Sequence, residues 1–352
     1  MPTFYEQVYD YDNLKRAYKQ TQLGSRKYKT GSFRLASAKE YWLAKLWKAL
    51  KEKKWRPGRY IEFYVYEPKA RLVHAPHTID KLVQFSTHLV LQEIYRPVFI
   101  KDSYACLEGK GTHKAVDRIQ HMMRTAAYMY EDPYIIKADV RKFFYSIDRE
   151  VLKQIYRKKI PRREADFLWL LDMIVDSSPE GDQGIPLGNV TSQDFANIYL
   201  NEVDQYCKRY LGLKWYVRYM DDITIVVKDK QTAKDVLAKM RHYVEDHLHL
   251  EFNQKTQIYP IWQGINTLGF KIYTDHKLVR DQSKRAMKRR IKAMDRKLKA
   301  GQIEEKDIQQ SVNAWLGHAR HSNSYNLARK IFAKYPYVKV EDKNWKFGKR
   351  HS

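Results

Sequence analysis

Cysteine is scarce in this chain, which has only Cys106 and Cys207 among its 352 residues. Two thiols cannot build a disulfide framework, nor a cysteine zinc site by themselves, so a reduced, cytoplasmic setting fits the composition. Long apolar runs are also missing: none approaches the roughly 18 residues that a membrane-spanning helix needs, and Met1–Asp10 lacks the pattern of a signal sequence. There is no internal repeat. These absences exclude disulfide-rich secreted proteins, membrane-spanning proteins and repeat proteins.

Acidic residues are few compared with basic ones: 41 Asp and Glu stand against 66 Lys and Arg, a formal net charge of +25. An excess of this size indicates a polyanionic partner, because each neutralised phosphate releases counterions. A basic protein of the membrane surface is the alternative. The 27 tyrosines and 8 tryptophans offer rings on which bases can stack, although most aromatic rings are core residues.

Apolar spacing and turn residues predict the helices and strands. Ser37 and Glu40 have the spacing of a capping box and predict a helix over about 38–54. Two extended runs, Ile61–Tyr66 and Arg71–Ala75, are predicted to form a hairpin. Further strands are predicted over 134–139, 214–219, 223–227, 256–260 and 266–273, and further helices over 78–95, 149–158, 163–176, 191–209 and 231–248.

The segment Ser283–Lys299 combines an apolar face with a strongly positive one. Met287, Ile291, Met294 and Leu298 recur at helical spacing, and nine Lys or Arg residues and one Asp lie between them. One interpretation is a solvated helix face. The other is a helix that grips a nucleic-acid backbone.

The sharpest feature is an acidic pair, Asp221 and Asp222, between two apolar runs. Adjacent carboxylates in such poorly solvated surroundings repel each other, and only cations stabilise them. Asp139 ends an earlier apolar strand. An acid at a strand end beside an acidic hairpin is the layout needed to hold two Mg²⁺ ions about 4 Å apart. Hard oxygen ligands suit Mg²⁺ and not zinc, so the sequence predicts a two-magnesium site.

Around these acids the sequence resembles reverse transcriptases. Five segments resemble the family's motifs in the family's order: Lys137–Asp148, Gly184–Gly188 with Thr191–Gln193 and Asn197–Leu200, Tyr219–Asp222, Asn253–Thr256, and Leu268–Phe270. The resemblance implies an α+β fold of the right-hand polymerase type, with fingers, a palm of antiparallel sheet and helices, and a helical thumb. It also implies an RNA-directed DNA polymerase that uses template RNA, dNTPs and two Mg²⁺ ions, with Mn²⁺ as an alternative, and that makes cDNA.

The resemblance implies roles for single residues. Asp139, Asp221 and Asp222 would bind the metal ions, Asp222 more weakly, together with the backbone carbonyl of Val140. One ion would lower the pKa of the primer 3′-hydroxyl, and the other would bind the triphosphate. Lys255 would protonate the leaving pyrophosphate, although an ordinary surface lysine is a fair alternative.

Phe144, five residues after Asp139, matches the family's aromatic steric gate, a ring that clashes with a ribose 2′-hydroxyl and so favours dNTPs. Core packing is the alternative. Asp148 is predicted to cap the next helix instead of binding metal. The other nucleotide-binding residues implied are Lys69, Arg71, Pro186, Leu187, Gly188 and Gln193. The nucleic-acid-binding residues implied are Tyr219, Met220, Leu268, Gly269, Lys284, Lys288, Arg289 and Lys292.

The same resemblance predicts the domain organisation. A basic helical extension would occupy 1–60, the fingers 61–133, and the palm 134–275 with an insertion near 149–190. A basic helical thumb would occupy 276–332, and a basic tail 333–352.

Within the family, the chain resembles the reverse transcriptases of diversity-generating retroelements. The segments that carry this are Phe99–Cys106 with Gly109–Val116, Gly188–Gln193, and Ala314–His318. Such enzymes are bacterial or phage-encoded and work with a structured template-repeat RNA and a small basic accessory protein that forms a ring. Group II intron enzymes usually end the second segment in Ser-Pro, and they carry maturase and often endonuclease regions, for which too little chain follows residue 330. The basic segment Lys15–Arg34 and the thumb helix are candidate RNA-contacting surfaces.

The turn Pro186-Leu187-Gly188 departs from the Pro-Gln-Gly of most reverse transcriptases. A Gln can form a hydrogen bond around the incoming nucleotide, whereas a Leu can only pack. Losing that contact would weaken discrimination by roughly 1–2 kcal/mol, and about 1.4 kcal/mol corresponds to tenfold in error rate. Diversity-generating enzymes carry an aliphatic residue here and misincorporate at template adenines. We therefore expect errors at adenines; a neutral Leu187 is the alternative.

Two other functions fit the same residues. A defence-associated or retron-like reverse transcriptase would copy a noncoding RNA with the same palm chemistry, and its gene would lack a variable repeat nearby. A catalytically idle RNA-binding protein on a polymerase scaffold is the alternative from another class. The retained acids Asp139, Asp221 and Asp222 argue against that alternative.

Overall fold

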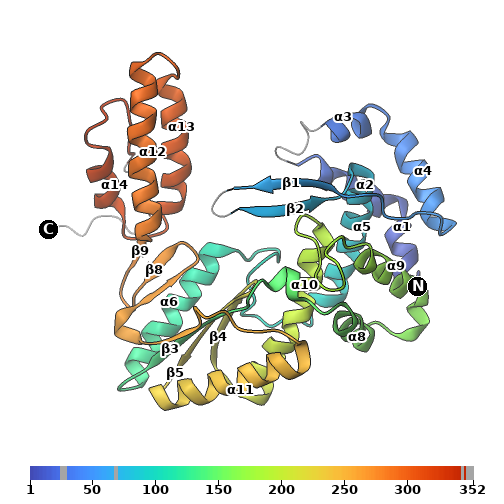
Figure 1. Ribbon diagram of the computed structural model, residues 1–352, viewed down its shortest axis with the longest axis horizontal. Helices are drawn as coiled ribbons and strands as arrows, with labels where there is room; N and C mark the ends of the chain where they lie inside the picture. Colours follow the sequence, from blue (N-terminus) through green and yellow to red (C-terminus); the bar gives the residue numbers. More distant parts are fainter. Residues whose placement is uncertain (24–29, 67–69, 342–344, 346–352) are drawn as a thin grey trace. The chain divides into compact units, whose positions relative to one another are not determined.

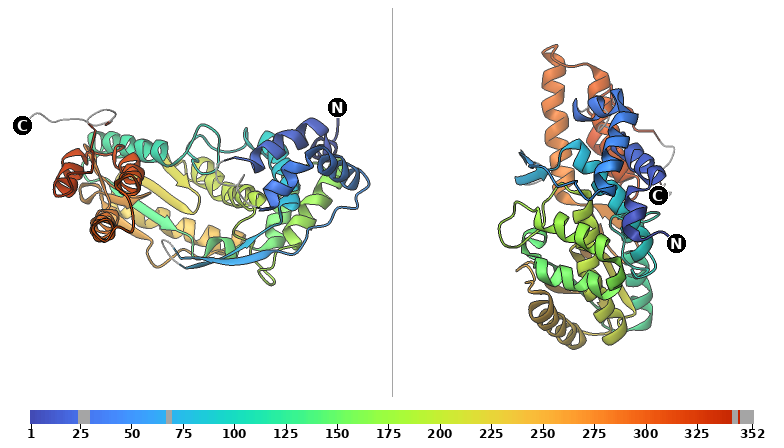
Figure 2. Two further views of the ribbon diagram at one scale, coloured as in Figure 1. Left: turned by 90° about the horizontal axis from the view of Figure 1, so that it is seen from above. Right: turned by 90° about the vertical axis from the view of Figure 1, so that its right-hand side faces the viewer.

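The computed structural model describes residues 1–23, 30–66, 70–341 and 345. The structure combines helices with antiparallel strand pairs (Figures 1 and 2). The chain divides into two compact units, each made of three stretches. Unit 1 comprises Met1–Cys106, Asp139–Leu213 and Ala238–Gln254, and unit 2 comprises Leu107–Ala138, Lys214–Leu237 and Lys255–Ser352. The domain boundaries expected from the sequence stay a prediction. Within the described residues, no helix is long and apolar enough to cross a membrane.

Unit 1 is mainly helical and is organised around one buried helix, α5. Its face is apolar at helical spacing, and it packs against α1, α2 and α10, where the amide of Asn13 donates to the Ser86 hydroxyl at 2.8 Å. The helices are α1 (Phe4–Tyr9), α2 (Tyr11–Thr21), α3 (Thr30–Ser37), α4 (Lys39–Lys51), α5 (Thr78–Tyr95), α7 (Phe143–Ser146), α8 (Arg149–Lys159), α9 (Ala165–Asp176) and α10 (Val190–Gln205), which continues as a π-helical turn, Tyr206–Tyr210. A 3₁₀ turn, Arg162–Glu164, precedes α9.

The capping box expected at Ser37 and Glu40 is wrong, although the helix itself is found as α4. Its N-cap is Ala38, which makes no side-chain cap. The Ser37 hydroxyl donates to the Arg34 carbonyl, and the Glu40 carboxylate accepts from the Tyr11 hydroxyl at 2.7 Å. Both side chains therefore have partners outside the cap.

The predicted hairpin is confirmed as β1 (Ile61–Val65) paired antiparallel with β2 (Arg71–Ala75). Every residue of β1 is exposed, whereas β2 turns His74 inward, where the side chain is buried. The base of the hairpin is thus joined to the body of unit 1 through β2.

Unit 2 contains the four-stranded sheet in the order β4-β5-β3-β6, except for Asp139, the last residue of β3, which is assigned to unit 1. Its strands are β3 (Tyr134–Asp139), β4 (Trp215–Tyr219), β5 (Asp222–Val227) and β6 (Gln257–Pro260), and helix α6 (Thr112–Met129) packs against β4 and β5 (Figure 1). Helix α11 (Lys230–Leu248) contributes residues to both units. A 3₁₀ turn, Ile261–Gln263, leads into a second sheet.

The second sheet of unit 2 corrects a predicted strand. The run 266–273 is not one strand but two, β7 (Ile265–Thr267) and β8 (Phe270–Ile272), joined by a tight turn and continued by β9 (Lys277–Val279). At the turn Leu268 has φ 49° and Gly269 has φ 87°, and backbone of that kind ends a strand.

In the described part of the chain, three helices follow the sheet (Figure 1): α12 (Asp281–Lys299), α13 (Glu305–Ala319) and α14 (Tyr325–Phe332). The expected apolar face of α12 is confirmed, because Met287 and Ile291 are buried against α13 and α14, and Met294 and Leu298 pack on the same cluster. The cations of α12 therefore lie away from this core.

Candidate active site

The acidic pair lies in a tight turn between β4 and β5. Tyr219 pairs with Asp222 across the hairpin, and Met220 has a left-handed φ of 51°. Behind the turn the guanidinium of Arg218, 0% exposed, donates to the Met220 carbonyl at 3.2 Å. The hydroxyl of Thr112, at the start of α6, donates to the Tyr219 hydroxyl at 3.0 Å. The turn that carries Asp221 is thus held by a buried cation and by α6.

Asp139 is the last residue of β3 and is held by Asn253. The backbone N–H of Asn253 donates to the Asp139 carbonyl at 2.6 Å, and its side-chain amide donates to the carboxylate at 3.2 Å. A β-bridge between Val140 and Phe252 continues this pairing. Asn253 therefore fixes both the main chain and the side chain of the first predicted metal ligand.

The sheet relates the strands that carry the three acids. β5, which begins with Asp222, is the hydrogen-bonded neighbour of β3, which ends with Asp139. Asp139 belongs to unit 1, and Asp221 and Asp222 belong to unit 2. Across residues 1–23, 30–66, 70–341 and 345, no group of three or more His, Cys, Asp or Glu side chains forms a metal-binding cluster. The metal-binding role of the acids stays a prediction.

The expected steric gate, Phe144, lies half-buried in α7 and is attached to the loop 181–188. Its carbonyl accepts the N–H of Ile185 at 2.8 Å. A Cβ on Gly184 would lie 3.0 Å from the Tyr145 backbone, and φ there is 87°, so this close approach requires glycine. Burial, followed by the nearby Glu180 carboxylate, raises the pKa of Tyr145.

The end of the same loop lies against strand β2. Pro186 is buried, Leu187 is half-buried, and the Leu187 carbonyl accepts the N–H of His74 at 3.0 Å. A Cβ on Gly188, whose φ is 119°, would lie only 2.6 Å from the His74 carbonyl. The predicted nucleotide-binding turn is therefore in direct contact with the β1–β2 hairpin. Gln193, in the first turn of α10, is exposed.

Three further cations were predicted to act on the nucleotide or the pyrophosphate: Lys69, Arg71 and Lys255. Arg71 is exposed at the start of β2, and Lys69 lies outside the described residues. Lys255 is exposed two residues after Asn253. The roles assigned to these side chains stay predictions.

The predicted primer-grip turn, Leu268-Gly269, is covered by a histidine of α13. The His318 ring stacks on Phe270 with centroids 4.2 Å apart, and a Cβ on Gly269 would lie 2.9 Å from that ring. The sequence segment Ala314–His318 is thus placed on the turn within unit 2.

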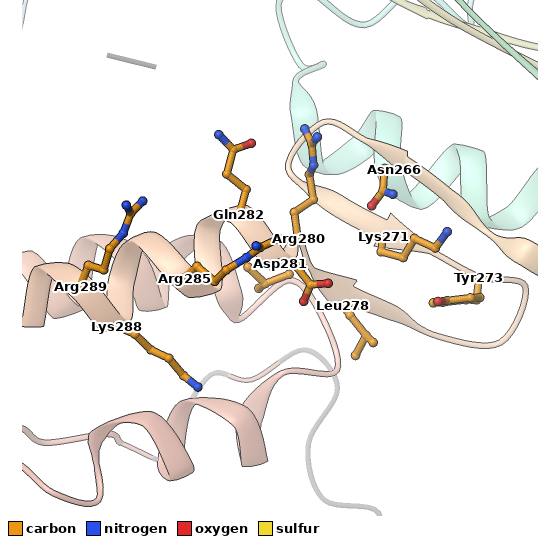
Figure 3. Close-up of a pocket in the computed structure, with 11 residues that line it drawn as sticks. Asn266, Lys271, Tyr273, Leu278, Arg280, Asp281, Gln282, Arg285, Lys288 and Arg289 are labelled. Carbon is orange, nitrogen blue, oxygen red and sulfur yellow. The ribbon is translucent and has the colours of Figure 1, made fainter. Parts of the chain in front are cut away.

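A large, basic cavity of about 1070 Å³ lies between the second sheet and α12 (Figure 3). Lys288 and Arg289, both predicted to bind nucleic acid, line it from the helix. Lys284 does not line it and is paired with Asp281 at 2.5 Å, while Lys292 is exposed further along α12. The other lining residues are Asn266, Lys271, Tyr273, Leu278, Val279, Arg280, Asp281, Gln282 and Arg285.

Sequence patterns had not singled out three residues that the structure places at these positions. Arg218 reads as an ordinary strand residue, and His74 as an alternating residue of a hairpin. Asn253 lies in a segment that resembles a family motif, but the sequence gives no role for its side chain. Only spatial proximity reveals what the three side chains hold.

The fold itself is that of the right-hand polymerases. The solved structure of telomerase from Candida tropicalis in complex with a TWJ fragment of telomeric RNA is similar, with a TM-score of 0.50 over 85% of this chain and 57% of that chain. The sequence identity is 14%, so this similarity concerns the fold alone.

Sequence comparison identifies the family. The protein-family model described as reverse transcriptase (RNA-dependent DNA polymerase) matches residues 53–272, more than half of the chain. The chain belongs to the reverse transcriptase family, and the expected RNA-directed DNA polymerase domain is confirmed.

Two curated relatives match part of the chain. The group II intron-encoded protein LtrA of Lactococcus lactis subsp. cremoris is 26% identical over 173 residues, 47% of this chain and 28% of that protein. Nuclear intron maturase 4, mitochondrial, of Arabidopsis thaliana is 24% identical over 247 residues, 55% of this chain and 30% of that protein. This chain thus spans less than a third of the length of these relatives.

Proposed function

We propose that this chain copies a structured RNA into cDNA by two-metal nucleotidyl transfer at Asp139, Asp221 and Asp222. The observation that carries this proposal is the neighbouring position of β3 and β5, one ending and the other beginning with one of these acids. The strands lie within the segment that matches the family.

The proposed donor set suits magnesium. It consists of the three carboxylates and the Val140 carbonyl, all hard oxygen ligands of the kind that Mg²⁺ prefers. When bound, the ions would lower the pKa of the primer 3′-hydroxyl and neutralise charge on the triphosphate. The chain's own contribution is to orient the acids: Asn253 fixes Asp139, and Arg218 fixes the Met220 carbonyl.

The nucleotide would lie against Phe144 and Leu187. Phe144 would exclude a ribose 2′-hydroxyl, Leu187 would pack near the base, and Arg71 would contact the triphosphate with Lys69. Lys255 would donate a proton to the pyrophosphate. Support for this arrangement comes from the hydrogen bond that joins the Phe144 segment to the Gly184–Gly188 loop.

The cavity at the root of α12 would hold the nucleic-acid backbone. Of its charged lining residues five are cations, and the single acid, Asp281, is already paired with Lys284. A cavity with this charge balance attracts phosphates, and Tyr273 offers a ring beside them (Figure 3).

Primer extension tests the polymerase proposal. With an RNA template, a DNA primer, dNTPs and Mg²⁺, the wild-type chain should extend the primer, and Asp221→Asn should lose at least a hundredfold in rate. Asp235→Asn, an exposed acid of α11, is the matched control and should keep the wild-type rate. Extension by Asp221→Asn at the wild-type rate would contradict the proposed site.

The finer proposal is that the enzyme serves a diversity-generating retroelement, with a basic oligomeric accessory protein as its partner. Leu187 supports it, because an aliphatic side chain cannot replace the hydrogen bond of a Gln. Leu187→Gln should lower the error frequency at template adenines by about tenfold. An unchanged error spectrum would reject the idea. Sequencing the RNA that copurifies with the chain distinguishes the two functions. A template repeat supports the diversity-generating retroelement, and a noncoding RNA without a variable repeat supports a defence system.

A further inference from the structure

The loop 181–188 is attached at both ends to one residue, His74 of strand β2. At the start of the loop, the Glu180 carboxylate contacts the imidazole Nδ1 of His74 at 2.7 Å. At the end of the loop, the Leu187 carbonyl accepts the backbone N–H of His74 at 3.0 Å. His74 therefore contacts the chain on both sides of the Leu187 turn, through its side chain at one end and through its backbone at the other.

The His74–Glu180 pair is shielded from solvent. The His74 side chain is 5% exposed and that of Glu180 is 11% exposed. Glu62, the cross-strand partner of His74, reaches the other ring nitrogen at 3.3 Å but is 62% exposed, so solvent competes for it. The Glu180 bond therefore contributes most to fixing the ring, because hydrogen bonds are stronger where water is excluded.

At the end of the loop, the backbone of Gly188 packs tightly against the backbone of His74. A Cβ on Gly188 would meet the His74 carbonyl at 2.6 Å and the Val73 side chain at 3.0 Å. Strand β2 and the loop therefore touch directly, and a shift of His74 must move Leu187, the residue before this glycine.

The middle of the loop is attached elsewhere. The N–H groups of Gly184 and Ile185 donate to the carbonyls of Ile147 and Phe144, each at 2.8 Å. These bonds do not involve His74. The Phe144 segment also has its own link to β2, because the Tyr145 hydroxyl donates to the Leu72 carbonyl at 3.3 Å, and this bond does not involve His74 either. The gate residue and the Leu187 turn are consequently held by different hydrogen bonds.

We infer that His74 and Glu180 are positioning residues that set base selection by holding Leu187, while sugar selection depends on the separate attachment at Phe144. This inference rests on the proposed polymerase function and adds a specificity device to it. Loosening the pair lets the Leu187 turn move and accept wrongly paired nucleotides, and it leaves the Phe144 segment in place.

The test compares selectivity ratios, which a general loss of folded enzyme does not change. For Glu180→Ala and His74→Ala, the kcat/KM ratio of wrong to right dNTP should rise about threefold to tenfold, the factor that corresponds to one hydrogen bond. The ratio of dNTP to rNTP should stay at the wild-type value. Glu180→Gln keeps an acceptor for the imidazole and should restore most of the base selectivity.

A matched control is available in His88, another largely buried histidine of unit 1 whose Nδ1 contacts a carboxylate, Asp194, at 2.8 Å. His88→Ala should lower stability without changing either ratio. The double variant His74→Ala with Glu180→Ala should be no worse than the single variants, because both act through one contact.

Two results would overturn the inference: wrong-to-right ratios unchanged in Glu180→Ala, or a dNTP-to-rNTP ratio that falls together with base selectivity. Absence of extension by the wild-type chain is a different result, since it would contradict the proposed function. Melting curves of each variant verify that the ratios refer to folded protein.

Discussion

At the scale of the residue, Asn253 connects the motif that contains Lys255 to the first predicted metal ligand, Asp139. Side chains that orient metal ligands typically change metal affinity by about 10–100-fold when removed. Asn253→Ala should therefore raise the Mg²⁺ concentration for half-maximal primer extension about tenfold or more. Asn313→Ala, an exposed amide of α13, is the control. An unchanged Mg²⁺ dependence would separate Asn253 from the metal site.

Asp148 illustrates a residue that the sequence placed correctly. It caps α8 by accepting the N–H groups of Glu150 and Val151, as predicted. Burial works to raise the pKa of this carboxyl, but the hydrogen bond with His249 and the two N–H groups bring it below the usual range. Asp148→Ala should lower the free energy of unfolding by about 1 kcal/mol at neutral pH.

The pH dependence of that loss follows from the direction of the shift. A carboxyl whose pKa is lowered by folding stabilises the fold above its unfolded pKa, and this contribution disappears as pH falls through the lowered value. The free energy of unfolding of wild type exceeds that of Asp148→Ala, and this difference, measured by urea unfolding, should become smaller in acid. The control is Asp132→Ala in an exposed loop. A difference in free energy of unfolding that becomes larger in acid would contradict the lowered pKa of Asp148.

At the scale of the element, three histidines join α6, α13 and the turn that follows α13. The His113 ring stacks on His321 with centroids 3.5 Å apart and lies 5.9 Å from His318. Burial first, and then repulsion from His321 and His318, lowers the pKa of His113 to about 4. The neutral imidazole is therefore the form that fits this packing.

Acid should weaken unit 2 through His113. Below about pH 6.5 the unfolded chain gains a proton that the folded His113 does not take up until about pH 4, so stability falls across this window as pH falls. His113→Phe should make the free energy of unfolding decrease less between pH 7 and pH 4, as measured by denaturant unfolding at each pH. The exposed His121→Phe on the same helix should not. If the free energy of unfolding changed equally with pH in His113→Phe and wild type, the lowered pKa of His113 would be contradicted.

Sequence patterns predicted elements better than they predicted contacts. Alternation in 61–75 and the apolar run ending at Asp139 predicted β1, β2 and β3 correctly, because each pattern is local. Helix α6 was missed, since Gly109 and Gly111 precede it and polar residues interrupt its apolar face. The histidine cluster was also missed: it joins residues about 200 positions apart, and no local pattern encodes that proximity.

At the scale of the whole molecule, the net charge of +25 predicts binding that weakens steeply with salt. Lys288→Glu combined with Arg289→Glu should lower RNA affinity and reduce the slope of log K against log salt by about 0.7–0.9 for each lost phosphate contact. Lys234→Glu with Lys239→Glu on α11 removes equal charge as the control. Equal slopes for the two pairs would argue against the cavity beside α12.

The convergence of Asp139 with Asp221 and Asp222 is the claim on which the function depends. Fe²⁺ bound in place of Mg²⁺ reduces added hydrogen peroxide to hydroxide and a hydroxyl radical, which cuts the nearby backbone, so the cut positions report which segments surround the ion. The account predicts cuts near both residue 139 and residue 221 in the wild-type chain, and the loss of both in Asp221→Asn. Cuts near only one of these positions would contradict it.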